Sequence, residues 1–169
     1  MEKEYFTKFG LKLCADHVVL FQLKDIVFDS RTLLKCMFGC KDWGKGLTCP
    51  SRKGSLLPWE YKKILNNYTW GVIIHSKDKR ISQKVSYEIE RDAFLKGYYF
   101  AFSLSDCALC KKCAGYKNES CINPSKSRPA FHSVGIDVYK TVHQFGLPLK
   151  PLKEGEDDKQ NWYSAVFIE

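Results

Sequence analysis

Seven of the eight cysteines in this 169-residue chain fall into two short clusters. Thiolates are the ligands that zinc and iron–sulfur centres prefer, whereas cysteines that only fill a hydrophobic core have no reason to cluster. Eight cysteines are too few to indicate a disulfide-held miniprotein of this length. The clusters therefore predict metal ligation.

The second cluster has the more diagnostic spacing, Cys-x2-Cys-x2-Cys, with a fourth cysteine after seven intervening residues. Three cysteines at this spacing can wrap one cubane, as in bacterial ferredoxins. The longer gap before the fourth cysteine allows it to return to the same cluster. We predict one [4Fe-4S] centre here, with tetrahedral zinc as the alternative, although zinc more often uses two separated Cys-x2-Cys pairs. The predicted ligands are Cys107, Cys110, Cys113 and Cys121.

The first cluster has the spacing Cys-x3-Cys-x8-Cys and offers only three thiols. Three thiolates can hold a four-iron cluster and leave one iron open to water, substrate or an external ligand. In zinc sites an open coordination position marks a catalytic metal, and we extend that logic by analogy. Three interpretations stay open: a second iron–sulfur centre, a zinc ion completed by a histidine, or one site shared with the second cluster. The candidate ligands are Cys36, Cys40 and Cys49, and His132 is the best candidate for a missing ligand.

Other reactive side chains are expected to be structural. Cys14 lies in an apolar, strand-like stretch and is predicted to be a buried, inert thiol. His17 and His75 lie in strand-like runs and are predicted to be core or edge residues. A charge run on a long predicted helix is expected to form a solvated face. It consists of Glu88, Glu90, Arg91 and Asp92.

The net charge of +8 is concentrated around the cysteines. Residues 35–53 and 107–128 each carry a local charge of +4, and the rest of the chain is balanced with 17 bases and 17 acids. Positive charge favours thiolate over thiol, so the bases suit an anionic metal–thiolate centre. Nucleic-acid binding is disfavoured, because only five of the 27 bases are arginine, the residue used for bidentate contacts.

Predicted strands and helices alternate along the chain, which indicates an α/β or α+β domain with a small mixed β-sheet and flanking helices. We expect a single domain over 1–169, with Cys-rich metal-binding loops at about 35–57 and 105–128. Loops of this length in a compact domain need something to order them. The expected strands are 5–13, 17–23, 70–75 and 162–168, and the expected helices are 59–66, 79–96 (capped by Asp78) and 129–145. A helix start or turn is expected at 29–31 and a polar loop at 153–160. The stretch 98–104 fits either a strand or a helix.

The cellular setting is expected to be the cytoplasm. The longest apolar runs are too short to span a membrane, and the charged start Met1-Glu2-Lys3-Glu4 does not have the pattern of a secretory signal. Thiols in a reducing compartment stay available to a metal.

An ordered set of motifs resembles an uncharacterised family of predicted metal-binding proteins found in anaerobic bacteria and archaea. The resemblance covers about 34–149 and implies a metal-binding, iron–sulfur protein with the seven clustered cysteines as ligands, but it supplies no reaction. One departure is that the usual Cys-Pro-Pro of the family is Cys49-Pro50-Ser51 here. The motifs are residues 34–36, 39–40, 48–50, 90–98, 107–121, 128–129 and 135–138.

Three functions follow as hypotheses. The first is electron transfer or a redox accessory role, with a redox partner protein. The second is an enzyme that uses the open iron of the three-cysteine centre as a Lewis acid on a small-molecule substrate. The third is a zinc-stabilised interaction module. Whether the chain is an enzyme, and which residues would be catalytic, stays open at this point.

Overall fold

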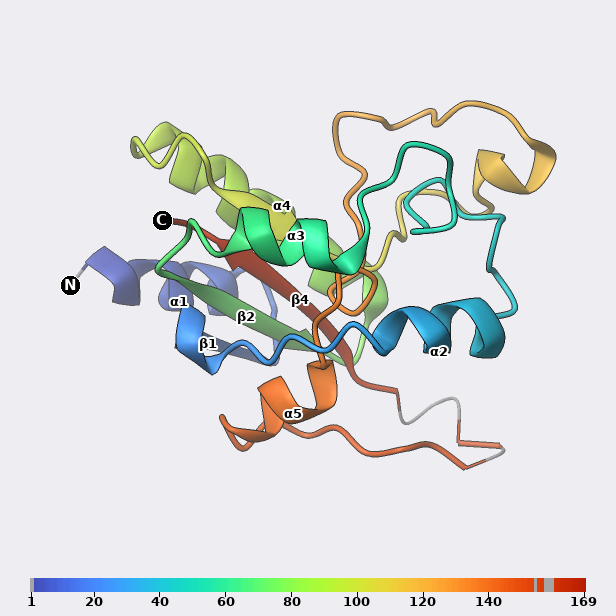
Figure 1. Cartoon of the computed structure of the whole chain (residues 1–169). Helices are drawn as coiled ribbons and strands as arrows, with labels where there is room; N and C mark the ends of the chain where they lie inside the picture. Colours follow the sequence, from blue (N-terminus) through green and yellow to red (C-terminus); the bar gives the residue numbers. More distant parts are fainter. Residues whose placement is uncertain (1, 154, 157–159) are drawn as a thin grey trace.

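A four-stranded antiparallel sheet forms the centre of the molecule. The computed structural model describes residues 2–153, 155–156 and 160–169, and its strands lie in the order β1-β2-β4-β3 (Figure 1). The central strands β2 and β4 are almost completely buried, which explains their continuous apolar sequence. The strands are β1 (His17–Gln22), β2 (Trp70–Ser76), β3 (Phe102–Leu104) and β4 (Trp162–Phe167).

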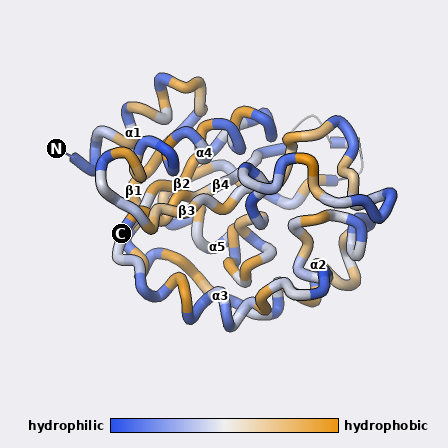
Figure 2. Tube along the Cα trace, turned by 90° about the horizontal axis from the view of Figure 1, so that it is seen from above, coloured by the Kyte–Doolittle hydropathy of each residue, from blue (hydrophilic) through white to orange (hydrophobic). Residues whose placement is uncertain are grey.

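Helices cover both faces of this sheet. On one face α1 and α4 pack against Val72 and Ile74, and on the other face α3 and α5 share a core with Ile73, so the molecule has three layers (Figure 2). The predicted fold class is confirmed. In the described part of the chain no helix combines the length and apolar character that a membrane span requires. The helices are α1 (Glu2–Lys12), α2 (Thr32–Gly39), α3 (Pro58–Leu65), α4 (Lys79–Leu95) and α5 (Val138–His143), with 3-10 turns η1 (Leu23–Asp25) and η2 (Ala114–Lys117).

Local sequence signals predicted most of these elements correctly. Pro58 begins α3, and Asp78 caps α4 by accepting hydrogen bonds from the backbone nitrogens of Arg80 at 2.7 Å and Ile81 at 3.3 Å. The ambiguous stretch 98–104 ends in the short strand β3. The sheet was expected to be mixed, and every pairing among the described strands is antiparallel.

Two predictions of secondary structure are wrong. Residues 5–12 belong to helix α1 and not to a strand, because Phe6, Phe9 and Leu13 repeat at helical spacing and pack on the sheet. The helix expected over 129–145 is reduced to α5, because Gly135 takes a φ of +91° and the backbone nitrogen of Asp137 donates to Val27 at 2.8 Å. The polar loop expected at 153–160 lies partly outside the described residues.

Cys14 is exposed, which corrects the prediction of a buried thiol. It follows α1 with a φ of 72°, in the left-handed region. The backbone nitrogen of Ala15 donates to Gly10 at 3.3 Å and that of Cys14 to Leu11 at 3.1 Å. These two bonds form a Schellman motif, in which glycine usually takes the left-handed position.

Cys14→Gly is therefore expected to raise the free energy of unfolding by about 1 kcal/mol, because it removes the cost of a left-handed residue that carries a Cβ. Urea denaturation under reducing conditions measures the change. Cys14→Ala is the matched control, since it removes the thiol and keeps the Cβ. An equal gain from both variants would contradict this explanation.

Candidate metal centre

All seven clustered cysteines line one cavity of about 880 Å³. The cavity lies at the end of the sheet where β2 and β3 finish and β4 begins, beside the first residues of α4. Figure 1 shows the two long loops together at this end, next to α2. The structure thus places both predicted loops at one site, while their ligation of a metal stays a prediction. The cysteines are Cys36, Cys40, Cys49, Cys107, Cys110, Cys113 and Cys121.

The first loop presents its three thiols from a helix and from a series of tight turns. Cys36 is buried on α2, Cys40 directly follows that helix, and Cys49 is half-buried in the loop. The hydroxyl of Ser51 donates a hydrogen bond to the Cys49 sulfur at 2.9 Å and accepts one from the Gly44 backbone nitrogen at 2.9 Å. Ser51 occupies the position at which the family resemblance expects proline, so this chain gains a hydroxyl donor to sulfur there.

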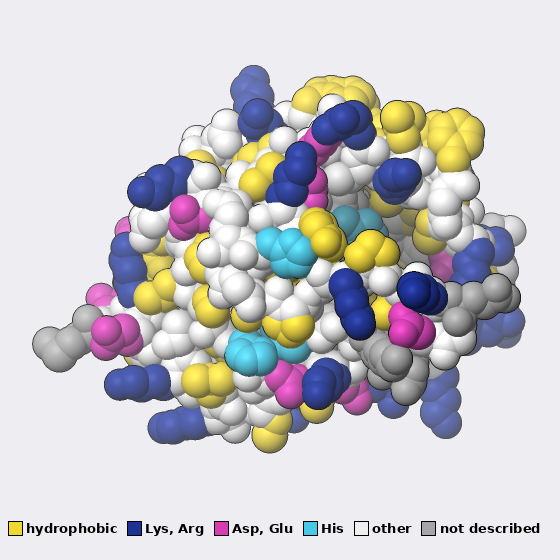
Figure 3. Space-filling model, turned by 90° about the horizontal axis from the view of Figure 1, so that it is seen from below, with side chains coloured by type: hydrophobic (Ala, Val, Ile, Leu, Met, Phe, Trp, Pro, Cys, Tyr) yellow, Lys and Arg dark blue, Asp and Glu magenta, His cyan; other side chains and the backbone are white. Residues whose placement is uncertain are grey.

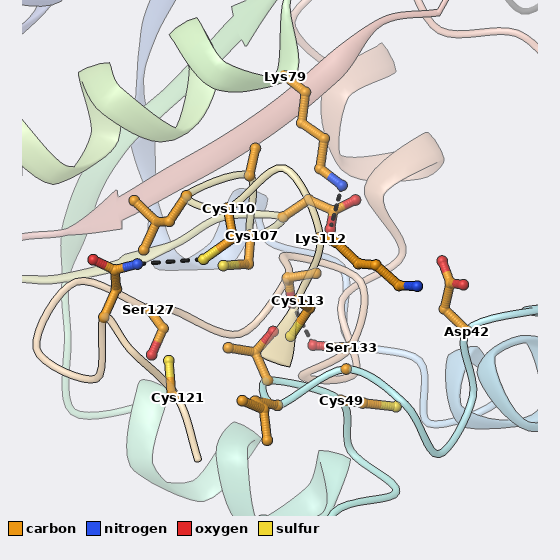
Figure 4. Close-up of a pocket in the computed structure, with 18 of the residues that line it drawn as sticks. Asp42, Cys49, Lys79, Cys107, Cys110, Lys112, Cys113, Cys121, Ser127 and Ser133 are labelled. Carbon is orange, nitrogen blue, oxygen red and sulfur yellow. Dashed lines mark hydrogen bonds and ion pairs between the residues drawn. The ribbon is translucent and has the colours of Figure 1, made fainter. Parts of the chain in front are cut away.

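The second loop wraps its four cysteines around the same cavity (Figure 4). The turn η2 fills the gap between Cys113 and Cys121, and it returns the chain so that the fourth thiol also lines the cavity. This arrangement agrees with the return that the spacing suggested. The side-chain amide of Asn123 donates to the Cys110 sulfur at 3.3 Å.

The two loops pack directly on each other at Gly115. A Cβ at Gly115 would lie 2.2 Å from the carbonyl oxygen of Lys45 and 2.9 Å from the Leu47 Cγ. The Tyr116 hydroxyl donates to the Asp42 carboxylate, and this bond raises the pKa of Tyr116 to about 12. Sequence reasoning did not find this contact, because no local pattern links the two loops.

Helix α4 also holds the second loop. The buried side chain of Gln83 accepts a hydrogen bond from the Ala108 backbone nitrogen at 2.7 Å through its Oε1. Farther along the helix, Glu90 accepts hydrogen bonds from the Ser103 nitrogen at 2.7 Å and from the Arg128 Nε at 3.0 Å, and it pairs with the Arg128 Nη2. Arg128 in turn donates to the carbonyl oxygens of Ser125 and Ser127 at 3.0 Å each.

The position of Glu90 corrects the expectation of a solvated face. Its side chain and that of Arg128 are each 13 % exposed, and the two residues close the second loop against α4 and β3. The pair joins residues 38 positions apart, so helical spacing alone could not reveal it.

Glu90→Gln is expected to lower the free energy of unfolding by about 2–3 kcal/mol, because it leaves the Arg128 guanidinium poorly solvated and without its charged partner. Chemical denaturation measures the change. Glu88→Gln on the same helix is the control and is expected to stay within about 0.5 kcal/mol, as is usual away from buried networks. Similar losses in both variants would contradict an anchoring role for Glu90.

The cavity wall is rich in positive charge. The acids on the wall are largely engaged: Asp78 caps α4, Asp42 accepts from Tyr116, and Asp106 pairs with Lys79 at 3.2 Å. Figure 4 shows Lys112 extending toward Asp42. The first turn of α4 adds the positive end of a helix dipole. The wall therefore favours an anionic occupant, and its bases are Lys77, Lys79, Arg80, Lys111 and Lys112.

Cys36 is poorly suited to ionise alone. Burial is the main cause that raises its pKa to about 11, and the neighbouring thiols of Cys49 and Cys40 act in the same direction. A bound metal cation deprotonates such a thiol outright. Cys36 therefore needs a cation to take up its ligating form.

His132 lines the same cavity, as expected of the best histidine candidate, although it lies outside any helix. His132 is an exposed residue, and desolvation by the surrounding protein lowers its pKa. A neutral imidazole is the form that binds metals. The other histidines do not line the cavity. The His143 ring forms a hydrogen bond with the Leu149 carbonyl oxygen at 2.7 Å. His17 and His75 face each other across β1 and β2, with 2.9 Å between their Nδ1 atoms, which confirms the edge and core positions predicted for these two.

The thiols of the cavity are not arranged as a preformed single-ion site. Among the described residues, no three Cys, His, Asp or Glu side chains already converge on one metal ion. In a four-iron cluster each thiolate binds a different iron, so the sulfurs stand farther apart than around one zinc, where each Zn–S bond is about 2.3 Å. Two buried donors beside the second loop, the Gln83 Nε2 and the Ser105 Oγ, also lack a partner in the described part of the chain, and cluster sulfur can accept such bonds.

Comparison with known proteins supports metal binding. The sequence profile of the family described as "Predicted metal-binding protein (DUF2284)" matches residues 19–168, a longer span than the motifs alone suggested. No curated protein and no solved structure matches the chain. The family description specifies neither the metal nor a reaction. With nearly its whole length matched, the chain belongs to the DUF2284 family of predicted metal-binding proteins.

Proposed function

We propose that the protein is an iron–sulfur protein with an electron-transfer or redox accessory role in the reducing cytoplasm. A [4Fe-4S] cluster would be held by Cys107, Cys110, Cys113 and Cys121, and a second centre by the first-loop trio. The observation that carries the proposal is the convergence of all seven clustered thiols on one basic cavity.

A bound four-iron cluster supplies a one-electron redox couple. The residues of this chain would set its properties. The Ser51 hydroxyl and the Asn123 amide donate to the sulfurs of Cys49 and Cys110, and hydrogen bonds to sulfur favour the more negative, reduced state. The lysines of the wall favour the same state electrostatically.

A second candidate function is an enzyme that acts on a small anionic molecule at the three-cysteine centre. The size of the cavity and the bases of its α4 wall, Lys77, Lys79 and Arg80, favour this alternative. Cys36, Cys40 and Cys49 would leave one iron open unless His132 completes the set. Zinc is the alternative metal at this trio.

Anaerobic purification followed by metal and sulfide analysis tests the proposal. We expect iron and acid-labile sulfide in equal amounts, a broad visible absorption that bleaches with dithionite, and an electron paramagnetic resonance signal in the reduced protein. Zinc without sulfide would overturn the iron–sulfur assignment. Perturbation of only one cluster spectrum by a small carboxylate would favour the enzyme.

A further inference from the structure

Helix α2 exposes an apolar face directly outside the first-loop thiols. Phe38 is 82 % exposed, Leu34 54 % and Met37 40 %. These three residues are spaced i, i+3 and i+4, so they share one face of the helix. Cys36 on the same helix is buried and lines the cavity. One short helix thus presents a thiol inward and an unpartnered apolar face outward.

Exposed bases surround this face. Lys35, Lys41 and Lys45 are all exposed, and the single acid within 35–53, Asp42, accepts the hydrogen bond of Tyr116. In Figure 3, exposed hydrophobic side chains lie at the upper right, on the side of the molecule where α2 lies, with Lys and Arg side chains beside them. An apolar centre with a positively charged rim is complementary to a partner with an apolar centre and an acidic rim.

A hollow joins this surface to the cysteines. It has a volume of about 450 Å³ and is lined by the exposed Lys35 and Lys41, by Asp42, by the buried Cys36 and by the exposed Cys40 and His132. A protein seated on α2 would cover this hollow and would therefore have a direct route to the first-loop thiols. Such a route is what electron transfer between two proteins requires.

We propose that the α2 face, formed by Leu34, Met37 and Phe38 with Lys35 and Lys41, docks a small electron-transfer protein whose surface is acidic around its own cluster. The inference rests on the proposed iron–sulfur function and names its partner class. One electron leaves the reduced cluster of the partner and enters the centre behind α2, so the partner is oxidised and this protein is reduced, with no bond made or broken. The small face suits the transient contacts of redox partners.

A second exposed aromatic group gives a matched control. Phe100 is 86 % exposed and follows the end of α4, whose other end faces the cavity. The 17 residues of α4 place these two ends about 25 Å apart. Loss of Phe100 therefore removes as much exposed aromatic surface as loss of Phe38, but far from the thiols.

Stopped-flow reduction of the oxidised holoprotein by an acidic plant-type [2Fe-2S] ferredoxin tests the proposal. Phe38→Ala is expected to lower the bimolecular rate constant about tenfold, as loss of an interface anchor does. Lys35→Glu with Lys41→Glu is expected to slow the reaction at low salt, with a difference that shrinks at high salt. Phe100→Ala should match the parent, and reduction by dithionite should be equal in all variants.

The outcomes distinguish a failure of the docking face from a failure of the proposed iron–sulfur function. Intact clusters, normal dithionite reduction and ferredoxin rates unchanged by Phe38→Ala and the lysine reversals would overturn the docking face alone. A homodimer that Phe38→Ala dissociates in analytical ultracentrifugation would assign the face to a second copy and overturn the acidic partner. Protein without iron and sulfide would overturn the proposed function, and this inference with it.

Discussion

Replacing Cys110 with serine is expected to remove one complete iron–sulfur centre while the sheet stays folded. A serine hydroxyl is a poor ligand for iron, and Cys110 also accepts the hydrogen bond from Asn123, so ligand and positioning contact are lost together. Two centres in the cavity predict that Cys110→Ser and Cys49→Ser each remove about half of the iron and sulfide, as expected for clusters of equal size. One shared centre predicts that either variant removes nearly all of it.

Cys14→Ser is the matched control for this experiment. Cys14 lies at the end of α1, outside the cavity, so its replacement should leave the iron and sulfide contents of the parent. Full iron in Cys110→Ser, or equal loss in Cys14→Ser, would contradict the assignment of the ligands. Circular dichroism verifies that the variants compared are folded.

The sheet should survive loss of metal because the cysteine loops lie outside both hydrophobic cores. Those cores are built from the strands, the helices and the segment around Phe131 and Val134, and residues 40–57 and 105–128 do not contribute to them. Anaerobic removal of metal with a chelator is expected to expose the two loops to protease while the sheet stays protected. Limited proteolysis with mass spectrometry locates the cuts, and uniform digestion of the whole chain would show that the metal orders the entire fold.

The parts of the fold that the sequence predicts are those with local causes. Pro58, Asp78 and the apolar run of β2 each act within a few residues, and the structure confirms the elements that all three predict. At 5–13 the aromatic content favours a strand, but the helical repeat of Phe6, Phe9 and Leu13 decides the structure. At 136–137 the chain pairs with residues 27–28, a remote partner that overrides local helix propensity.

The candidate site also has features with local causes, which the sequence predicts, and features that depend on distant residues. The spacing of the cysteines is local, and it indicated both groups and the return of Cys121. The convergence of the two groups depends on contacts between distant residues, above all Gly115 on Lys45 and Glu90 on Arg128. Neither contact has a periodic signature, so the sequence favours two centres and leaves one shared site open as an alternative.

Gly115→Ala is expected to separate the two loops and to release metal from the first of them. The added Cβ would meet a backbone oxygen, that of Lys45, at 2.2 Å, and a backbone atom cannot rotate aside as a side chain can. Overpacking of this kind costs about 1–3 kcal/mol. Cys49 follows this contact in the chain, so we expect the Cys36, Cys40 and Cys49 centre to lose iron while the second-loop centre keeps it.

Gly39→Ala is the matched control. Gly39 lies on α2 between Cys36 and Cys40, and a Cβ there meets nothing within 4 Å. Alanine is also a better helix former than glycine, so the first centre should keep its iron. Loss of iron in Gly39→Ala but not in Gly115→Ala would refute loop packing as the cause.

Tyr116 reports the same separation through a signal other than the iron content. The Asp42 carboxylate holds the pKa of Tyr116 at about 12, above its ordinary value of 10, so this contact stabilises the loops below pH 10 and is lost as the pH rises toward 12. If Gly115→Ala parts the loops, the pKa of Tyr116 should fall toward 10. Ultraviolet difference titration of the parent holoprotein and of the variant, with Tyr116→Phe to identify the signal, measures the shift. If Gly115→Ala loses iron while the pKa of Tyr116 is unchanged, the loops have stayed together. The loss of iron would then arise at the thiols and not from the contact between the loops.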